Sequence, residues 1–208
     1  VWGWANNGER VVVRFRDQRK STVAADERWS VTLDPLEPGG PDTLTVSGFD
    51  TITIKEVRVG EVWLASGQSN MAWRLAKTNH AGESLAGLEG LDLHVFAVKE
   101  RSLDSPRRDV QGAWHGPDAR AMAKVSAVAY LFGREIFETQ QVPVGILLSY
   151  KGGTRAVNWT SAEVLEDNPD SASHYHYYQK LVDAFPTTYN AWLESGREGR
   201  PPASPVRR

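Results

Sequence analysis

The hydrophobic pattern of the chain changes near residue 58, and this change limits the folds open to it. Before that point, apolar and polar residues alternate in short runs separated by turn sequences at 6–8 and 38–41. Alternation with a period of two is typical of strands with one buried face. We therefore expect a small β-sandwich over residues 1–57, lacking an outer strand at its N-terminal edge. The alternating runs are Val11-Val13-Phe15, Trp29-Val31-Leu33, Leu44-Val46 and Ile52-Ile54.

From residue 58 to residue 208 the apolar runs are continuous and alternate with helical stretches. The runs at 62–65, 93–98 and 144–148 predict strands buried on both faces, as in the parallel sheets of α/β layers. Trp29 and Trp63 are expected in the core, because both lie within strand patterns. Only about three parallel strands can be counted, and so small a sheet would leave apolar faces uncovered. We expect the α/β domain over 58–208 to be incomplete.

One crossover helix is predicted between the second and third parallel strands. Its pattern ends at Gln141-Val142-Pro143, because proline cannot continue a helix. After Trp159 the sequence predicts one or two further helices, and the Gly- and Pro-rich residues 199–205 predict no regular element. The helical positions expected to face the core are Val125, Val128, Ala129, Phe132 and Ile136.

Composition excludes several classes of function. The net charge is −2 and no long basic run occurs, so the chain lacks the electrostatic pattern of a nucleic-acid-binding protein. No stretch approaches the roughly 20 apolar residues that span a bilayer, so no membrane partner is expected. The absence of cysteine excludes disulfides, thiolate nucleophiles and Cys-based zinc sites. His174 and His176 would point to different faces of a helix, so they do not predict a metal site. The oligomeric state stays open.

The sharpest candidate for chemistry is Ser69, in the segment 60–71. Here an apolar strand runs directly into the turn sequence Gly67-Gln68-Ser69-Asn70. A serine at the carboxyl end of a parallel strand, just before a helix, lies at the sheet edge where ligands bind. Gly67 would permit close approach, and the Ser69 N–H could stabilise an oxyanion. The alternative is that Ser69 or Asn70 only caps a helix.

A second apolar strand ends in the glycine pair Gly152-Gly153, and its end should lie beside the first. Glycine amides can approach a ligand closely, which suits an oxyanion hole or an anion nest. The alternative is a tight turn without a ligand. A phosphate-binding P-loop is excluded, because Lys151 precedes the glycines and the required spacing is absent.

Several segments together resemble one known family, the sialate O-acetylesterase-like group of the SGNH hydrolases. The resemblance implies a β-sandwich followed by a three-layer α/β/α, flavodoxin-like hydrolase domain. It also implies an extracellular or periplasmic enzyme that removes O-acetyl groups from sialic acid or other sugars without a metal or organic cofactor. The segments that carry it, in the family's order, are 1–5 (VWGWA), 60–71 (GEVWLASGQSNM), 126–135 (SAVAYLFGRE), 152–154 (GGT) and 159–161 (WTS).

Carried over residue by residue, the resemblance makes Ser69 the nucleophile. The oxyanion hole would be formed by the amides of Ser69 and Gly153, with Gly152 beside them. The chain departs from the family at two positions: Lys151 stands where a tryptophan is common, and Ala72 where an acidic residue is common. These departures leave the specificity of the pocket open. Residues expected to position the substrate are Gln68, Asn70, Thr154 and Trp159.

The family's later Gln-Gly-Glu block and its Asp-x-x-His pair do not occur in the chain. Serine is a weak nucleophile unless a histidine accepts its proton, so this segment alone is expected to be nearly inactive. The alternative function is a non-catalytic carbohydrate-binding protein or an inactive pseudo-esterase, favoured by the tryptophans and the missing base. The local histidines weighed as substitutes, and not favoured, are His80, His115 in an expected loop, and His174 and His176 near Asp170.

Overall fold

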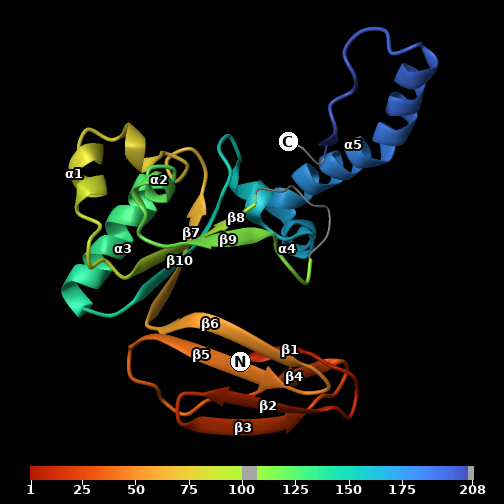
Figure 1. The fold of residues 1–208 in the computed structure, drawn as a ribbon. Coiled ribbons are helices and arrows are strands. Elements are labelled where there is room, and N and C mark those ends of the chain that lie inside the picture. Colours follow the sequence, from red (N-terminus) through yellow and green to blue (C-terminus); the bar gives the residue numbers. More distant parts are fainter. Residues whose placement is uncertain (100–106, 206–208) are drawn as a thin grey trace.

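A computed structural model of the chain describes residues 1–99 and 107–205. Residues 100–106 and 206–208, all within the second expected domain, lie outside the described part. The described residues form three sheets (Figure 1). They build two separate hydrophobic cores, one from the first 59 residues and one from the residues after 64. The expected mixed α/β fold is thus confirmed, while the sandwich and the three-layer arrangement stay predictions.

The first core lies between a four-stranded and a two-stranded antiparallel sheet. The larger sheet has the order β3-β2-β5-β6, and β1 pairs with β4. Val11, Val13 and Phe15 of β2 alternate inward and meet Leu44 of β5 and the buried Trp29 of β4. The expected boundary between residues 57 and 58 falls inside β6. The strands are β1 (Trp2–Trp4), β2 (Arg10–Phe15), β3 (Gln18–Val23), β4 (Arg28–Ser30), β5 (Gly39–Ser47) and β6 (Thr51–Val59).

The second sheet has the order β7-β10-β8-β9. Its first three strands run parallel, as predicted, and β9 runs antiparallel to β8. The expected loop around His115 is therefore wrong, because Gly112–His115 pairs along β8 as an edge strand. The strands are β7 (Glu61–Gly67), β8 (Leu93–Val98), β9 (Gly112–His115) and β10 (Val144–Tyr150).

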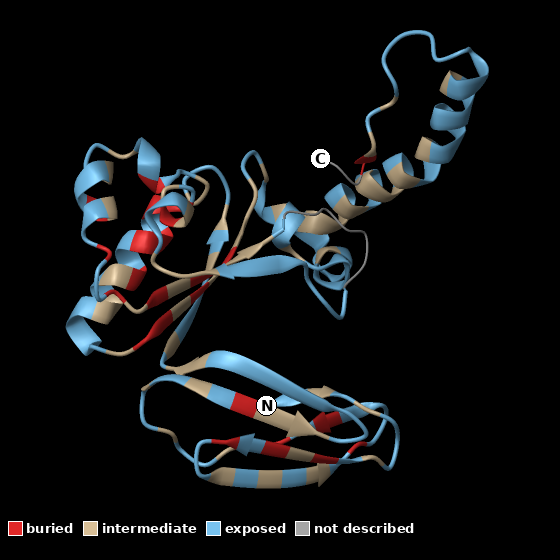
Figure 2. Cartoon of the chain, viewed as in Figure 1, coloured by how far each residue is buried: buried red, intermediate tan, exposed pale blue. Residues whose placement is uncertain are grey.

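The expectation that β7 is buried on both faces is wrong. Val62 is 65% exposed and Leu64 67% exposed, because β7 is an edge strand and no described element covers the face on which they lie. Trp63 points to the other face but is also 42% exposed, packed edge-on against Phe132. Trp63 is thus not a core residue, whereas Trp29 is. Figure 2 shows that the buried residues of this half gather in α3 and in the strands beneath it.

The predicted crossover helix is α3 (Ala127–Gln140), which packs against β10 and β8. It ends where expected, with Gln141 in the left-handed region. The predicted inward face is partly wrong: Val128 is 51% and Phe132 43% exposed, and Tyr130 and Gly133 are buried instead. A Cβ at Gly133 would lie 2.6 Å from Ile146 Cδ1, so glycine permits the close approach of helix and sheet.

The remaining helices are short, except for the last. One or two helices were expected after Trp159, and two α-helices are present. The last, α5, has no buried residue and extends away from the sheets (Figures 1 and 2). Within the described ranges, no helix combines the length and apolar character needed to cross a bilayer. These elements are η1 (Leu75–Lys77), α1 (Ala81–Ala86), α2 (Ala119–Met122), η2 (Ala156–Trp159), α4 (Ala162–Asp167) and α5 (Pro169–Glu194).

Candidate active site

The two predicted site segments leave the sheet side by side. Strands β7 and β10 are hydrogen-bonded neighbours in parallel register, and Tyr150 lies opposite Gly67 at their carboxyl ends. The ladder continues one step further, because the Lys151 N–H donates to the Gly67 carbonyl oxygen at 3.0 Å. The turn of Ser69 and the turn of Gly153 therefore begin at the same edge of the sheet, as the sequence predicted.

Glycine is required by the backbone at one position in each turn. Gly67 has a φ of +146° and Gly153 a φ of +78°, values that side-chain-bearing residues rarely adopt. No atom beyond the chain neighbours lies within 4 Å of where a Cβ of Gly152 or Gly153 would be, so this turn faces open space. The glycine pair does form a tight turn, and the geometry also leaves room for a ligand against its backbone.

Ser69 is exposed in an irregular turn rather than at the start of a helix. The Ala72 N–H donates to Gln68 O at 2.9 Å, and the segment then continues to the short η1. The capping alternative for Ser69 or Asn70 is wrong, since His80 precedes α1 and Arg74 precedes η1. The Ser69 Oγ donates instead to the side-chain oxygen of Gln68 at 2.5 Å.

Residues after Ser69 anchor its turn to the N-terminus of α3. The fully buried Ser126 donates from Oγ to Met71 Sδ at 3.2 Å, and its Oγ also accepts from the Ala129 N–H as the N-cap of α3. The Ala127 N–H donates to Trp73 O at 2.8 Å. From the sequence, this segment indicated only the family resemblance. The signal that could have predicted the capping role of Ser126 is its position just before a helical pattern, where serine is a common N-cap.

Thr154 and Trp159, both predicted to position substrate, are hydrogen-bonded to each other. Trp159 Nε1 donates to Thr154 Oγ1 at 2.8 Å, and Thr154 Oγ1 donates to Lys151 O at 2.8 Å. These bonds connect η2 to the glycine turn. Gln68 and Asn70 are exposed on the Ser69 turn. The catalytic and positioning roles of all these residues stay predictions.

Free backbone donors occur in both turns. Within the part of the chain that the structure describes, the amides of Ser69, Gly152 and Gly153 donate no hydrogen bond to protein. A free N–H at such a position can hold a negatively charged oxygen. The arrangement can thus supply a hydroxyl nucleophile and oxyanion donors from neighbouring strand ends.

The described residues provide no histidine for Ser69. His94 lies opposite Gly145, which pairs on its other side with Val62. Val62 is five residues before Gly67, so His94 lies about 16 Å along the strands from the edge where Ser69 is found. His115 pairs with Val95, also toward the amino end of the parallel strands. His94 was not among the residues expected near the site. Its Nε2 lies 2.8 Å from Asp92 Oδ1, but the register places this pair at the wrong edge of the sheet.

The other three histidines make no contact with Ser69 either. His80 is exposed beside Glu83, and His174 and His176 lie on the projecting helix α5. Among residues 1–99 and 107–205, no three His, Asp or Glu side chains gather in a group that could hold a metal ion.

Known proteins match the chain over most of its length. The human (Homo sapiens) and orangutan (Pongo abelii) sialate O-acetylesterases are each 30% identical to it over 188 residues, which is 80% of this chain and 36% of each relative. Over four fifths of its length the chain is a homologue of the sialate O-acetylesterases. The resemblance to this family is thereby confirmed. No family model matches the chain.

A solved structure agrees with this relationship to the sialate O-acetylesterases. The crystal structure of a carbohydrate acetylesterase from Xanthomonas citri matches with a TM-score of 0.74 and 33% sequence identity, covering 81% of this chain and 40% of that one. The chain spans only about a third of the length of the curated sialate O-acetylesterases.

Proposed function

We propose that the protein is a carbohydrate O-acetylesterase that uses Ser69 as its nucleophile. The observation that carries the proposal is the register of β7 and β10, with Tyr150 opposite Gly67. It brings the exposed Ser69 hydroxyl and the free amides of the Gly153 turn to one sheet edge. The relationship to sialate O-acetylesterases and to a carbohydrate acetylesterase supports an acetylated sugar as the substrate.

In the proposed reaction, Ser69 Oγ attacks the carbonyl carbon of the acetyl group and loses its proton to a base. The amides of Ser69 and Gly153, with Gly152 beside them, stabilise the negative charge on the carbonyl oxygen. The bond to the sugar oxygen breaks, and that oxygen takes up the proton. Water then attacks the acetyl–serine ester and releases acetate, restoring the Ser69 hydroxyl.

The remaining contacts support the geometry of this reaction. Gln68 holds the Ser69 hydroxyl in the resting state, and Asn70 lies on the same turn. The Trp159–Thr154 hydrogen bond fixes the glycine turn and places an indole beside it. We expect the full-length protein to supply the histidine base, and we expect it to act outside the cell or in the periplasm.

The experiment is labelling of the full-length protein with a fluorophosphonate, which reacts with activated serines. We expect labelling of the wild type, loss in Ser69→Ala, and retention in Ser66→Ala, whose exposed serine lies three residues earlier on β7. The wild type and Ser66→Ala should release acetate from an O-acetylated sugar, and Ser69→Ala should not. Labelling that persists in Ser69→Ala would falsify the assignment.

The alternative function, a non-catalytic carbohydrate-binding protein or an inactive pseudo-esterase, predicts a different result in the same experiment. The folded wild type would then bind acetylated sugar without labelling, and Ser69→Ala would bind it equally well.

A further inference from the structure

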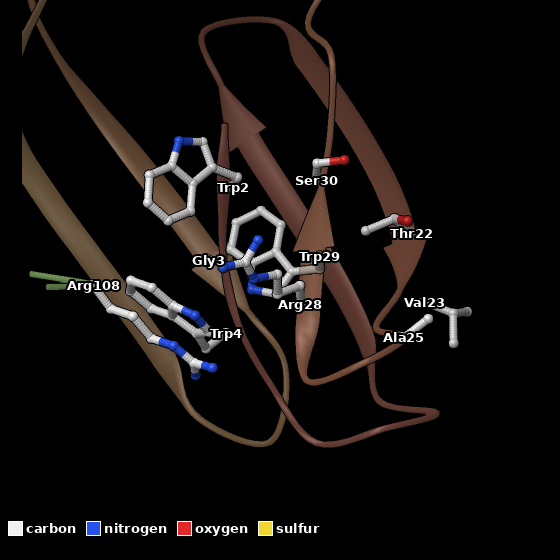
Figure 3. A pocket seen from close by; sticks show the side chains of 10 residues that line it. All are labelled: Trp2, Gly3, Trp4, Thr22, Val23, Ala25, Arg28, Trp29, Ser30 and Arg108. Atoms are coloured by element: carbon white, nitrogen blue, oxygen red, sulfur yellow. The ribbon is translucent and has the colours of Figure 1, made fainter. Parts of the chain in front are cut away.

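A hollow of about 600 Å³ lies at strands β1 and β4, in the half of the molecule that contains the first core (Figure 3). None of the candidate active-site residues lines it. Two tryptophans of β1 line it, although large aromatic side chains usually lie in a core. Trp2 is 67% exposed and Trp4 47% exposed, and their rings meet edge-on with centroids 5.3 Å apart. An exposed pair of large rings is typical of a binding surface.

The strand pairing fixes these rings on one face of the β1–β4 sheet. Trp2 and Trp4 alternate with Gly3 and so point to the same side, and their partners on β4 are Ser30 and Arg28. Residues directly opposite each other in an antiparallel pair share a face. The two indoles, a guanidinium and a hydroxyl are therefore presented together.

Gly3 and Trp29 support this face from below. A Cβ at Gly3 would lie 2.9 Å from Trp29 Cζ2, so the buried Trp29 ring packs directly against the β1 backbone. A rigid strand with its outer rings already in place needs little ordering when a ligand binds. The exposed rings are thus held by the core without being part of it.

The hollow is positively charged. Its lining includes Arg28 and Arg108 and no acidic residue. Among the described residues, neither guanidinium forms an ion pair or a side-chain hydrogen bond within the chain. Figure 3 draws Arg108 and Trp4 among the side chains that line the hollow. Unpaired guanidinium groups bind carboxylates through charge-assisted hydrogen bonds.

We propose that this hollow binds an acidic oligosaccharide, with the apolar faces of its sugar rings against Trp2 and Trp4 and a carboxylate at Arg28 and Arg108. Indole rings offer an apolar surface of the size of a sugar ring, and the arginines add selectivity for charge. The site is independent of Ser69, and it would hold a glycan on the protein without taking part in ester cleavage.

The experiment is calorimetric titration of the full-length protein with trigalacturonate and with its neutral trimethyl ester. The acid should bind about tenfold more tightly than the ester, as expected for one charge-assisted contact. Trp2→Ala should weaken binding of both ligands about tenfold, because it removes ring contact but little core packing. Arg28→Gln should weaken binding of the acid alone.

Matched controls come from the same sheets. Phe49→Ala removes an aromatic ring that is 88% exposed at the β5–β6 turn, and Arg14→Gln removes an exposed arginine of β2; both should bind like the wild type. Ser69→Ala should also bind normally, which separates this site from the proposed esterase. The proposal is overturned if the wild type binds neither ligand, if acid and ester bind equally, or if Trp2→Ala binds like Phe49→Ala.

Discussion

The buried Ser126 hydroxyl joins α3 to Met71, whose sulfur it contacts at 3.2 Å, two residues after the proposed nucleophile Ser69. The same oxygen caps α3 by accepting from the Ala129 N–H. In Ser126→Ala both bonds disappear, and we expect a loss of about 1 kcal/mol in unfolding free energy from the cap alone. Because the Ser69 turn also loses its anchor, kcat for ester cleavage should fall.

The control for Ser126 is another helix cap far from Ser69. Asn168 caps α5 by accepting from the Asp170 N–H at 2.9 Å. Asn168→Ala should weaken that helix end and leave kcat unchanged. Equal kcat values in wild type and Ser126→Ala, measured well below the melting temperature, would show that the contact with Met71 does not position the turn.

Gly60 sets the distance between β7 and β10. A Cβ at Gly60 would overlap the carbonyl oxygen of Pro143, the atom that accepts from the Glu61 N–H at 2.9 Å. This neighbour is backbone and cannot move unless the strands separate. We expect Gly60→Ala to lower the unfolding free energy by about 1–3 kcal/mol.

The matched control is Gly82→Ala in α1, where nothing lies within 4 Å of the added methyl group. Alanine favours helix, so this change should raise stability by about 0.5–1 kcal/mol. Chemical denaturation of both variants measures the difference. Equal stabilities would contradict the strand contact at Gly60.

Hydrophobic periodicity was sufficient to predict the parallel strands and the sheet edge from which the turns of Ser69 and Gly153 both begin. It failed for the inward face of α3, because apolar residues occur all round this helix and the pattern does not single out one face. Gly133, which packs at the helix–sheet contact, has no side chain to contribute a hydrophobic signal. Close approach depends on the shape of the neighbours, here Ile146 and Leu93.

The exposure of Val62 and Leu64 could not be read from the sequence either. An apolar run predicts a strand that can be covered on both faces, but whether it is covered depends on its position in the sheet and on other segments. Val62 and Leu64 are exposed because no described element packs over their face of β7. β3 and β9 were missed because the first is largely polar and the second is only four residues long.

Asp92 connects the two halves of the chain. Its Oδ1 lies 2.7 Å from Arg58 Nε of β6 and 2.8 Å from His94 Nε2 of β8. Asp92→Ala would leave two half-buried donors facing each other, and we expect a loss of about 1–2 kcal/mol in unfolding free energy. Proteolysis near residue 60 should also become faster, because this contact links β6 to the second sheet.

The stability cost of Asp92→Ala can be compared with that of breaking an exposed ion pair of similar length. Lys20 and Asp34 are 2.6 Å apart, and the Asp34 side chain is 66% exposed. Asp34→Ala should therefore cost less than about 1 kcal/mol. If both variants lose the same free energy in urea titrations, Asp92 has no special role at the connection.

The variant Gly153→Ala is the most direct test of the proposed oxyanion donors. Its φ of +78° is unfavourable for alanine, and open space surrounds the added methyl group, so Gly153→Ala strains the backbone without a clash. We expect a stability loss of about 1–2 kcal/mol and a fall in kcat of tenfold or more, since a displaced donor loses much of its transition-state stabilisation. Gly8→Ala is the control, because Gly8 has a φ of +82° and equally open surroundings in another turn. It should lose similar stability with unchanged kcat, whereas equal kcat in the two variants would remove the Gly153 amide from the proposed mechanism.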